Sequence, residues 1–299
     1  MTADDTFRFL YRNTWFQAPT LAAGLYVVAT PIGNLGDITL RALETLAGCS
    51  VIACEDTRTS GILLKRFGID RPKVSYNEHN AQTRGPDLIR QISEGAAVAL
   101  ISDAGTPLVS DPGQRLVREA IEAGLSVVPL PGASAPLAAL VASGLPSEDF
   151  RFCGFLPSKA QARTRRLTEL ADEPSTLIFF ESPNRIQSTI DTLRNVFGAE
   201  RQVVVAREIT KMHETFYRGP LADVGDRFNA MDKVKGEIVV VVAGAAEAAA
   251  AATPEAVEAQ LREALQSMKT KQAAAHVAER NGLSKQELYR LALTLKDDR

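Results

Sequence analysis

Short apolar segments that alternate with amphipathic ones constrain the fold of this chain more than any other feature. In the first part of the sequence such segments lie at residues 25–30, 50–54, 97–101 and 126–130. Helical patterns lie between them, near residues 37–47, 58–67, 84–94 and 113–123, and several of these end at a glycine, as helices commonly do. Strands that are apolar on both faces are typical of a parallel sheet covered by helices on both sides. The first part is therefore predicted to be an α/β domain.

The composition changes near residues 144–149, and a second set of strand-like segments follows. We expect strands at 150–155, 176–180, 202–206, 213–217 and 237–242, with antiparallel pairing among the last ones and helices near 158–171 and 183–196. After an alanine-rich linker (244–252), Thr253-Pro254 starts a helix, and the capping box Ser284-Lys-Gln-Glu287 opens another. The predicted organisation is an N-terminal extension (1–23), two α/β domains (24–145 and 146–245) and a helix-turn-helix-like module (253–299). The extension is interpreted as loosely attached, with aromatic residues that could dock on the body or on a second subunit.

Charge and cysteine content exclude several classes of protein. The formal net charge is -2, so nucleic acid can be bound only through local basic patches. The three cysteines form no C-x-x-C pair, which argues against a disulfide framework or a zinc site and favours a reducing, cytoplasmic setting. No run of about 18 apolar residues occurs, so no membrane span is expected. No bound metal is expected either, because the cysteines lack the spacing of a zinc site.

Three loops of small residues follow predicted parallel strands, at residues 30–37, 102–113 and 131–135. The carboxyl ends of parallel strands meet at one edge of a sheet, where open α/β folds bind ligands. Asp103 and Thr106 supply hydrogen-bonding groups, and Ser134 precedes a helix N-terminus that favours negative charge. The first loop lacks the G-x-G-x-x-G fingerprint, so a nicotinamide oxidoreductase is disfavoured. Each loop taken alone is also compatible with an ordinary turn, but the three together favour a ligand site.

Charged residues also follow predicted strands, in the stretches 55–58, 78–80, 181–185 and 207–214. Such residues lie at the rim of a sheet, where they carry either catalysis or solvated, ion-paired charge. His79 could simply satisfy a turn. Lys159, Arg163, Arg165 and Arg166 share one predicted helix, which is either a phosphate-binding patch or a solvated face.

The joint pattern resembles the ribosomal RNA small subunit methyltransferase I family, which belongs to the tetrapyrrole-methylase superfamily. The matching stretches, in order, are LYVVATPIGNLGDIT (25–39), CEDTR (54–58), EHN (78–80), ISDAGTPLVSDPG (101–113), PGASA (131–135), FCGFLP (152–157), ESPNR (181–185), AREITKMHE (206–214) and KGEIVVVV (235–242). The C-terminal helix-turn-helix also resembles the module appended in that family, whereas residues 1–23 have no recognised counterpart.

This resemblance implies two α/β domains with S-adenosylmethionine in the cleft between them. It also implies a homodimer that methylates the ribose 2'-hydroxyl of a cytidine in small-subunit (16S) ribosomal RNA. The cofactor contacts it implies are Pro31, Asp103, Ala104, Gly105, Thr106, Pro107, Ser134, Ala135, Ala206, Lys235, Gly236 and Glu237. A ribose hydroxyl must lose its proton, and the candidate general bases are Lys211, Glu214, Glu55 and Asp56. The candidate substrate contacts are Arg58, His79, Asn80, Arg185 and Arg207.

Two alternatives stay open at this point. One is a methyltransferase of the same fold that acts on a small tetrapyrrole, against which the terminal module and the CEDTR and EHN stretches argue. The other is a ligand-sensing regulator that binds DNA through its terminal module, which the near-neutral charge disfavours.

Overall fold

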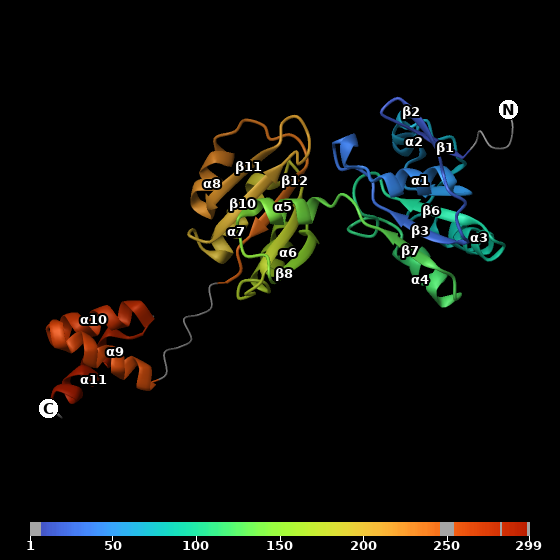
Figure 1. Cartoon of the computed structure of the whole chain (residues 1–299). Coiled ribbons are helices and arrows are strands. Elements are labelled where there is room, and N and C mark those ends of the chain that lie inside the picture. Colours follow the sequence, from blue (N-terminus) through green and yellow to red (C-terminus); the bar gives the residue numbers. More distant parts are fainter. Residues whose placement is uncertain (1–6, 246–253, 282, 298–299) are drawn as a thin grey trace. The chain divides into compact units, whose positions relative to one another are not determined.

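The computed structural model describes residues 7–245, 254–281 and 283–297. It contains two compact units, one formed by Met1–Ala171 with Ser175–Ala243 and the other by Asp172–Pro174 with Gly244–Arg299 (Figure 1). Predictions for residues 1–6, most of the alanine-rich linker and Gly282 lie outside the described residues.

The larger unit contains a five-stranded, all-parallel sheet in the order β5-β4-β6-β3-β7, which confirms the predicted α/β architecture. Its strands are β3 (Gly24–Val28), β4 (Val51–Cys54), β5 (Lys73–Ser75), β6 (Ala97–Ile101) and β7 (Val127–Leu130). The connecting helices are α1 (Leu40–Gly48), α2 (Thr57–Arg66), α3 (Ala81–Ser93) and α4 (Gln114–Glu122). The short edge strand β5 was not predicted, because three partly exposed residues give no apolar run.

Alternation along the strands explains why helices cover both faces of this sheet. Leu25 and Leu100 pack with α3 and α4 in one core cluster. Tyr26 and Ile101 point to the other face, where they pack with α1 and α2. Successive side chains of a strand point to opposite faces, so a strand that is apolar throughout requires cover on both sides.

The N-terminal residues form a β-hairpin rather than a loose extension. Strands β1 (Arg8–Tyr11) and β2 (Thr14–Gln17) pair across Arg12-Asn13, both of which have left-handed backbone angles, as a tight two-residue hairpin turn requires. Phe9 is buried in the core with α1, and the Leu10 N–H donates to the Phe67 carbonyl at 2.7 Å. The prediction of loose attachment is therefore wrong for residues 8–17, and the alternative that their aromatic residues dock on the body is confirmed.

A second five-stranded sheet, in the order β11-β10-β12-β9-β8, follows in the same unit. Its strands are β8 (Phe150–Phe155), β9 (Thr176–Glu181), β10 (Gln202–Arg207), β11 (Thr215–Pro220) and β12 (Ile238–Val242). Apart from the parallel β8–β9 pair its strands run antiparallel, as was predicted for the last ones. Helices α6 (Ala160–Thr168), α7 (Ile186–Phe197) and α8 (Leu221–Asn229) cover one face; α8 was not predicted.

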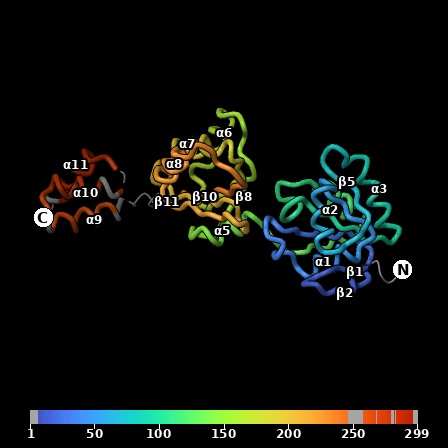
Figure 2. Tube along the Cα trace, turned by 90° about the horizontal axis from the view of Figure 1, so that it is seen from above, coloured from blue at the N-terminus to red at the C-terminus, as the bar shows by residue number. Residues whose placement is uncertain are grey.

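Helix α5 (Ala135–Ser143) covers the opposite face of this second sheet, although it follows a strand of the first (Figure 2). Ala139 and Leu140 pack against Val204 and Val241. The Arg218 guanidinium donates to the carbonyl of Ser143 at 3.3 Å and to that of Ala142. The chain therefore crosses from one sheet to the other immediately after the Pro131–Ser134 loop, ten residues before the composition changes.

The smaller unit contains helices α9 (Pro254–Ser267), α10 (Thr270–Asn281) and α11 (Lys285–Asp297). Leu261, Ala274 and Leu288 belong to its small separate core. The Ser284 hydroxyl accepts the Glu287 N–H at 3.4 Å, consistent with the predicted capping box. Within the described ranges, no helix is both long and apolar enough to cross a lipid bilayer.

Two of the three thiols are buried, which disfavours the reactive thiolate form. Burial raises the pKa of Cys49 to about 12 and also raises the pKa of Cys54, whereas Cys153 is only partly buried. Because the thiolate is the reactive species, we expect a thiol reagent at pH 8 to modify one cysteine rapidly in the native protein and three after unfolding in urea. Fast loss of a second native thiol would contradict this placement.

Candidate active site

The three small-residue loops follow three neighbouring strands, β6, β3 and β7, and hydrogen bonds join them. Thr30 and Gly105 exchange two backbone hydrogen bonds of 2.9 and 3.0 Å, which link the first loop to the second. The Thr106 hydroxyl donates to the Ala133 carbonyl at 3.0 Å and links the second to the third. The predicted convergence of these loops at one sheet edge is confirmed, and they form one continuous surface.

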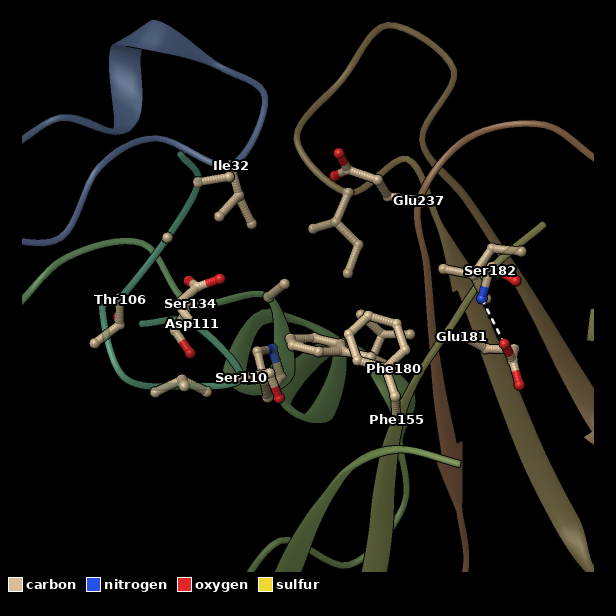
Figure 3. Close-up of a pocket in the computed structure, with 18 of the residues that line it drawn as sticks. Ile32, Thr106, Ser110, Asp111, Ser134, Phe155, Phe180, Glu181, Ser182 and Glu237 are labelled. Atoms are coloured by element: carbon tan, nitrogen blue, oxygen red, sulfur yellow. Dashed lines mark hydrogen bonds between the residues drawn. The ribbon is translucent and has the colours of Figure 1, made fainter. Parts of the chain in front are cut away.

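A cavity of about 380 Å³ opens on this surface (Figure 3), which is within the usual range for small-molecule sites. One side is lined by 104–106, 109–111 and 134–136, from the loops of the first sheet. The other side is lined by Phe155, 180–183 and 236–239, from the second sheet. Ile32 and Ile209 complete the wall. Both sheets therefore contribute to one pocket.

The pocket combines an apolar wall with a few polar groups. The Phe155 and Phe180 rings lie 5.4 Å apart, and Phe155 remains more than half exposed. Ser134 is the N-cap residue of α5, lines the pocket and makes no side-chain capping bond, so its hydroxyl is available to a ligand. Pro136, at the second position of α5, has no N–H to offer. Burial raises the pKa of Asp111, and the nearby Asp103 carboxylate raises it further.

Two segments beside the pocket hold non-glycine residues in left-handed backbone conformations. Leu108 and Ser110 have φ values of 72° and 66° in the loop after β6. Glu208 and Thr210 have φ values of 54° and 66° in the loop after β10. Such conformations cost roughly 1–3 kcal/mol each and cluster at functional sites, so both segments are shaped at the expense of stability.

Lys211 links the loop after β10 to Glu237, which lines the pocket. Its ammonium lies 2.9 Å from Glu208 Oε1 and 3.1 Å from Glu237 Oε2, and Glu208 also accepts the Glu237 N–H at 2.9 Å. Burial lowers the pKa of Lys211, but the hydrogen bonds and charges of the two carboxylates outweigh burial and leave that pKa raised. This environment opposes the predicted role of Lys211 as a general base, because a base must be unprotonated.

The other three candidate bases differ in their surroundings. Burial raises the pKa of Glu55, and the carboxylates of Asp103 and Asp111 raise it further. Hydrogen bonds from Arg58 lower the pKa of Asp56 to about 2, which makes Asp56 a poor proton acceptor. Glu214 accepts the Thr210 N–H at 2.6 Å and closes its own loop. Glu55 is therefore the candidate whose surroundings most favour a proton acceptor, although it is not among the residues that line the pocket.

Comparison with known proteins assigns the chain to a family. The sequence matches the tetrapyrrole (corrin/porphyrin) methylases over residues 24–225 and the RsmI C-terminal HTH domain over residues 250–296. The ribosomal RNA small subunit methyltransferase I of Mesorhizobium japonicum is 53% identical over 285 residues, which cover 95% of this chain and 96% of the relative. The protein of the same name from Haemophilus influenzae is 47% identical, over 90% of this chain and 96% of its own. The chain belongs to the ribosomal RNA small subunit methyltransferase I family.

Solved structures of this superfamily share the fold. A cobalt precorrin-4 methyltransferase of cobalamin biosynthesis superimposes with a TM-score of 0.56 at 17% identity, over 73% of this chain and 94% of its own. The uroporphyrin-III C-methyltransferase of Thermus thermophilus gives 0.52 at 20% identity, over 74% of this chain and 94% of its own. At these identities the likeness concerns architecture alone, and it agrees with the predicted fold class.

Of the predicted cofactor contacts, those that line the pocket are Ala104, Gly105, Thr106, Ser134, Ala135, Gly236 and Glu237. Pro31, Asp103, Pro107, Ala206 and Lys235 are not among the lining residues. Ala206 is fully buried in the core between α5 and the second sheet, and Asp103 Oδ1 accepts the Asp56 N–H at 3.3 Å.

The prediction missed the apolar wall of the pocket, formed by Ile32, Phe155, Phe180 and Ile209, together with Asp111. The matching stretches contained all of these except Phe180, but nothing marked them as facing a cavity.

None of the five predicted substrate contacts lines the pocket. Arg185 pairs at 2.6 Å with Glu181, whose side chain is fully buried, so Arg185 compensates a buried negative charge. The Asn80 amide closes a turn by accepting the Asn77 N–H at 2.9 Å and donating to the Ser75 carbonyl at 3.1 Å.

The remaining three lie nearer the surface. The Arg58 guanidinium is 89% exposed and pairs with Asp56 at 2.7 Å. Arg207 Nε donates to the Lys235 carbonyl at 2.5 Å. His79 is exposed, and its N–H donates to the Asn77 side chain at 3.1 Å, which agrees with a turn histidine. Asn80 and Arg185 both use their side chains within the protein, and their roles as RNA contacts stay predictions.

The packing of Glu208 against residue 236, beside the pocket, requires a glycine at that position. A Cβ at Gly236 would lie 2.5 Å from the Glu208 carboxyl carbon, at a φ of +93°. Gly236→Ala should therefore displace Glu208 from Lys211 and from the Glu237 N–H, and lower the affinity for a methyl donor about tenfold or more, measured by calorimetry. Gly95→Ala is the matched control, since Gly95 has a φ of +103° but nothing within 4 Å. Equal affinity in both variants would show that the Glu208 contacts do not shape the pocket.

Proposed function

We propose that this chain transfers a methyl group from S-adenosylmethionine to the ribose 2'-hydroxyl of a cytidine in small-subunit ribosomal RNA, as a cytoplasmic homodimer that uses no metal. The observation that carries the proposal is the single pocket that the three joined loops form with the second sheet, in a chain 53% identical to a ribosomal RNA small subunit methyltransferase I. The fold is shared with methyltransferases that act on tetrapyrroles, so the RNA substrate is inferred from the close relatives and not from the fold.

The pocket residues fit a sulfonium nucleoside with an amino-acid tail. Phe155, Phe180 and Ile32 supply the apolar surface that a nucleoside requires. Ser134 and the N-terminus of α5 suit a carboxylate, whereas Asp111 and Glu237 suit cationic groups. When bound, S-adenosylmethionine supplies a methyl group that is already activated by the positive sulfur. The protein is left to bind, orient and remove a proton.

Methyl transfer is an in-line displacement, so much of the catalysis consists of holding the acceptor oxygen opposite the leaving sulfur. The rigid loops, fixed by the Thr30–Gly105 and Thr106–Ala133 hydrogen bonds, provide that positioning. We assign the removal of the hydroxyl proton to Glu55, which follows β4, the neighbour of β6 in the sheet. Its raised pKa, caused by burial and then by Asp103 and Asp111, makes it a stronger base than an exposed carboxylate.

The test is methyl transfer from labelled S-adenosylmethionine to small ribosomal subunits purified from cells that lack this protein. We expect stoichiometric incorporation at one cytidine, located by mass mapping of the RNA, and no incorporation into subunits from wild-type cells. Uroporphyrinogen III serves as the competing acceptor. Transfer to the tetrapyrrole, or no transfer to RNA by protein that binds the donor, would contradict the proposal.

A further inference from the structure

The N-terminal hairpin places exposed aromatic rings beside the end of α2. Trp15 and Phe16 are 48% and 44% exposed, although β1 is fixed to the body through Phe9 and Leu10. The Trp15 ring lies against Gly68, where an added Cβ would be 2.4 Å from it, and the Arg8 guanidinium lies 4.3 Å from its centre. The tryptophan is therefore packed against the body while about half of its surface is in contact with water.

The surroundings of these rings are strongly basic. Residues 7–17 and 57–73 contain seven lysines and arginines but one acidic residue, Asp70, in a chain whose net charge is -2. In the part of the chain that the structure describes, Arg12, Lys65, Arg66 and Lys73 are exposed and form no ion pair. A shallow hollow lined by 70–73 and Thr57 continues this basic surface to the start of α2, where Arg58 lies. The lysine and arginine side chains thus extend from the hairpin to the start of α2, which Glu55 closely precedes in the chain.

We infer that the hairpin, the end of α2 and residues 70–73 bind single-stranded RNA, with Lys65, Arg66 and Arg12 on phosphates. A base would stack on the part of the Trp15 ring that Arg8 leaves exposed. Exposed aromatic rings among unpaired cations are the combination that proteins use for single strands, since every base has a face to stack and every phosphate a charge to neutralise. Two copies of the same cationic surface would repel each other, so a second copy of this chain is a poorer occupant. This inference rests on the proposed RNA substrate and adds a binding surface outside the pocket.

Trp15 is the only tryptophan in the chain, so its fluorescence reports on this surface alone. We would titrate the full-length protein with a single-stranded 20-nucleotide RNA and with a transcribed fragment of small-subunit ribosomal RNA, and measure binding in parallel by anisotropy of labelled RNA. Base stacking on Trp15 should quench its emission with the same midpoint as the anisotropy. Both midpoints should move to higher RNA concentration as salt is added.

Charge-removing variants test the phosphate contacts. Lys65→Gln/Arg66→Gln should weaken RNA binding at least about fivefold and reduce the slope of log affinity against log salt by about 0.7 per lost contact. Arg12→Asn should act in the same direction without harming the hairpin, because Asn tolerates the left-handed angle at this position. Arg90→Gln/Arg118→Gln is the matched control: it removes two exposed charges from α3 and α4 and should leave affinity unchanged.

The outcomes separate this inference from the proposed function. Active protein that binds RNA with unaltered Trp15 emission, and whose affinity is the same in the K65Q/R66Q variant, would overturn the inference and leave the proposed function standing. A change in Trp15 emission on dilution without RNA, together with a monomer–dimer shift in the Arg12→Asn variant, would assign the hairpin to self-association instead. Absence of both RNA binding and methyl transfer would overturn both.

Discussion

Replacing Glu181 with alanine should lower the free energy of unfolding by about 3 kcal/mol. The Glu181 side chain is fully buried and accepts hydrogen bonds from Arg185, from the Thr189 hydroxyl at 2.7 Å and from the Ser182 N–H at 2.6 Å. Removing one partner of a buried ion pair costs roughly 3–5 kcal/mol, because the other charge is left without compensation. We expect the lower end of this range, since a quarter of the Arg185 side chain remains in contact with water.

Urea unfolding followed by circular dichroism would measure this loss. Glu169→Ala is the matched control, because Glu169 pairs with Arg166 at 3.0 Å but is half exposed, and such surface pairs contribute at most about 1 kcal/mol. Glu181→Gln should fall between the two, since an amide oxygen can still accept one of the hydrogen bonds. A similar small loss for Glu181→Ala and Glu169→Ala would refute the structural role assigned to the Glu181–Arg185 pair.

Replacing Glu55 with glutamine should lower the rate of methyl transfer about 10²–10⁴-fold, the usual contribution of a general base. Affinity for the methyl donor should stay near the wild-type value, because Glu55 does not line the pocket. The rate of the wild-type enzyme should fall as pH decreases through the pKa of Glu55, since protonation removes the base. Burial and the neighbouring carboxylates raise that pKa, so the fall begins at a higher pH than for an exposed glutamate.

Asp56→Asn is the control for this variant, because Asp56 lies next to Glu55 and its pKa of about 2 keeps it ionised across the whole range. We expect its pH–rate profile to keep the wild-type shape, with the acid limb moved to slightly lower pH because the Asp56 carboxylate is one of those that raise the pKa of Glu55. The Glu55→Gln variant should instead show a low rate that no longer responds to acid. A Glu55→Gln enzyme with the wild-type rate would exclude Glu55 and direct attention to Asp111, which lines the pocket and also has a raised pKa.

The sequence predicted the first sheet well because its strands are buried on both faces. The segment Ala97–Ile101 is apolar at every position and buried throughout. Such a short apolar segment is typical of a strand that is covered on both faces. The missed elements lack that signal. Strand β5 is short and partly exposed, and the hairpin strand β2 is exposed at every residue, so neither carries an apolar run.

The candidate site was predicted in part for a similar reason. The small residues of Ala104–Thr106 and Ser134-Ala135 mark a backbone that approaches a ligand, and their position after strands places them at one edge. The roles of the charged candidates were less predictable. The sequence around a charged residue at a strand end does not reveal whether its side chain contacts a substrate or a neighbouring side chain of opposite charge. Arg185 and Lys211 both found partners within the protein.

Local sequence thus determined which segments are strands, where their glycine-rich ends lie and to which family the chain belongs, since these depend on apolar pattern and on residues close together in the chain. Only the tertiary structure decided that α5 covers the second sheet, that Phe155 and Phe180 face the three loops, and that Glu55 shares its surroundings with Asp103 and Asp111. The physical reason is that cavities and pKa values arise from groups distant in sequence, whose separation is fixed only when both sheets have packed.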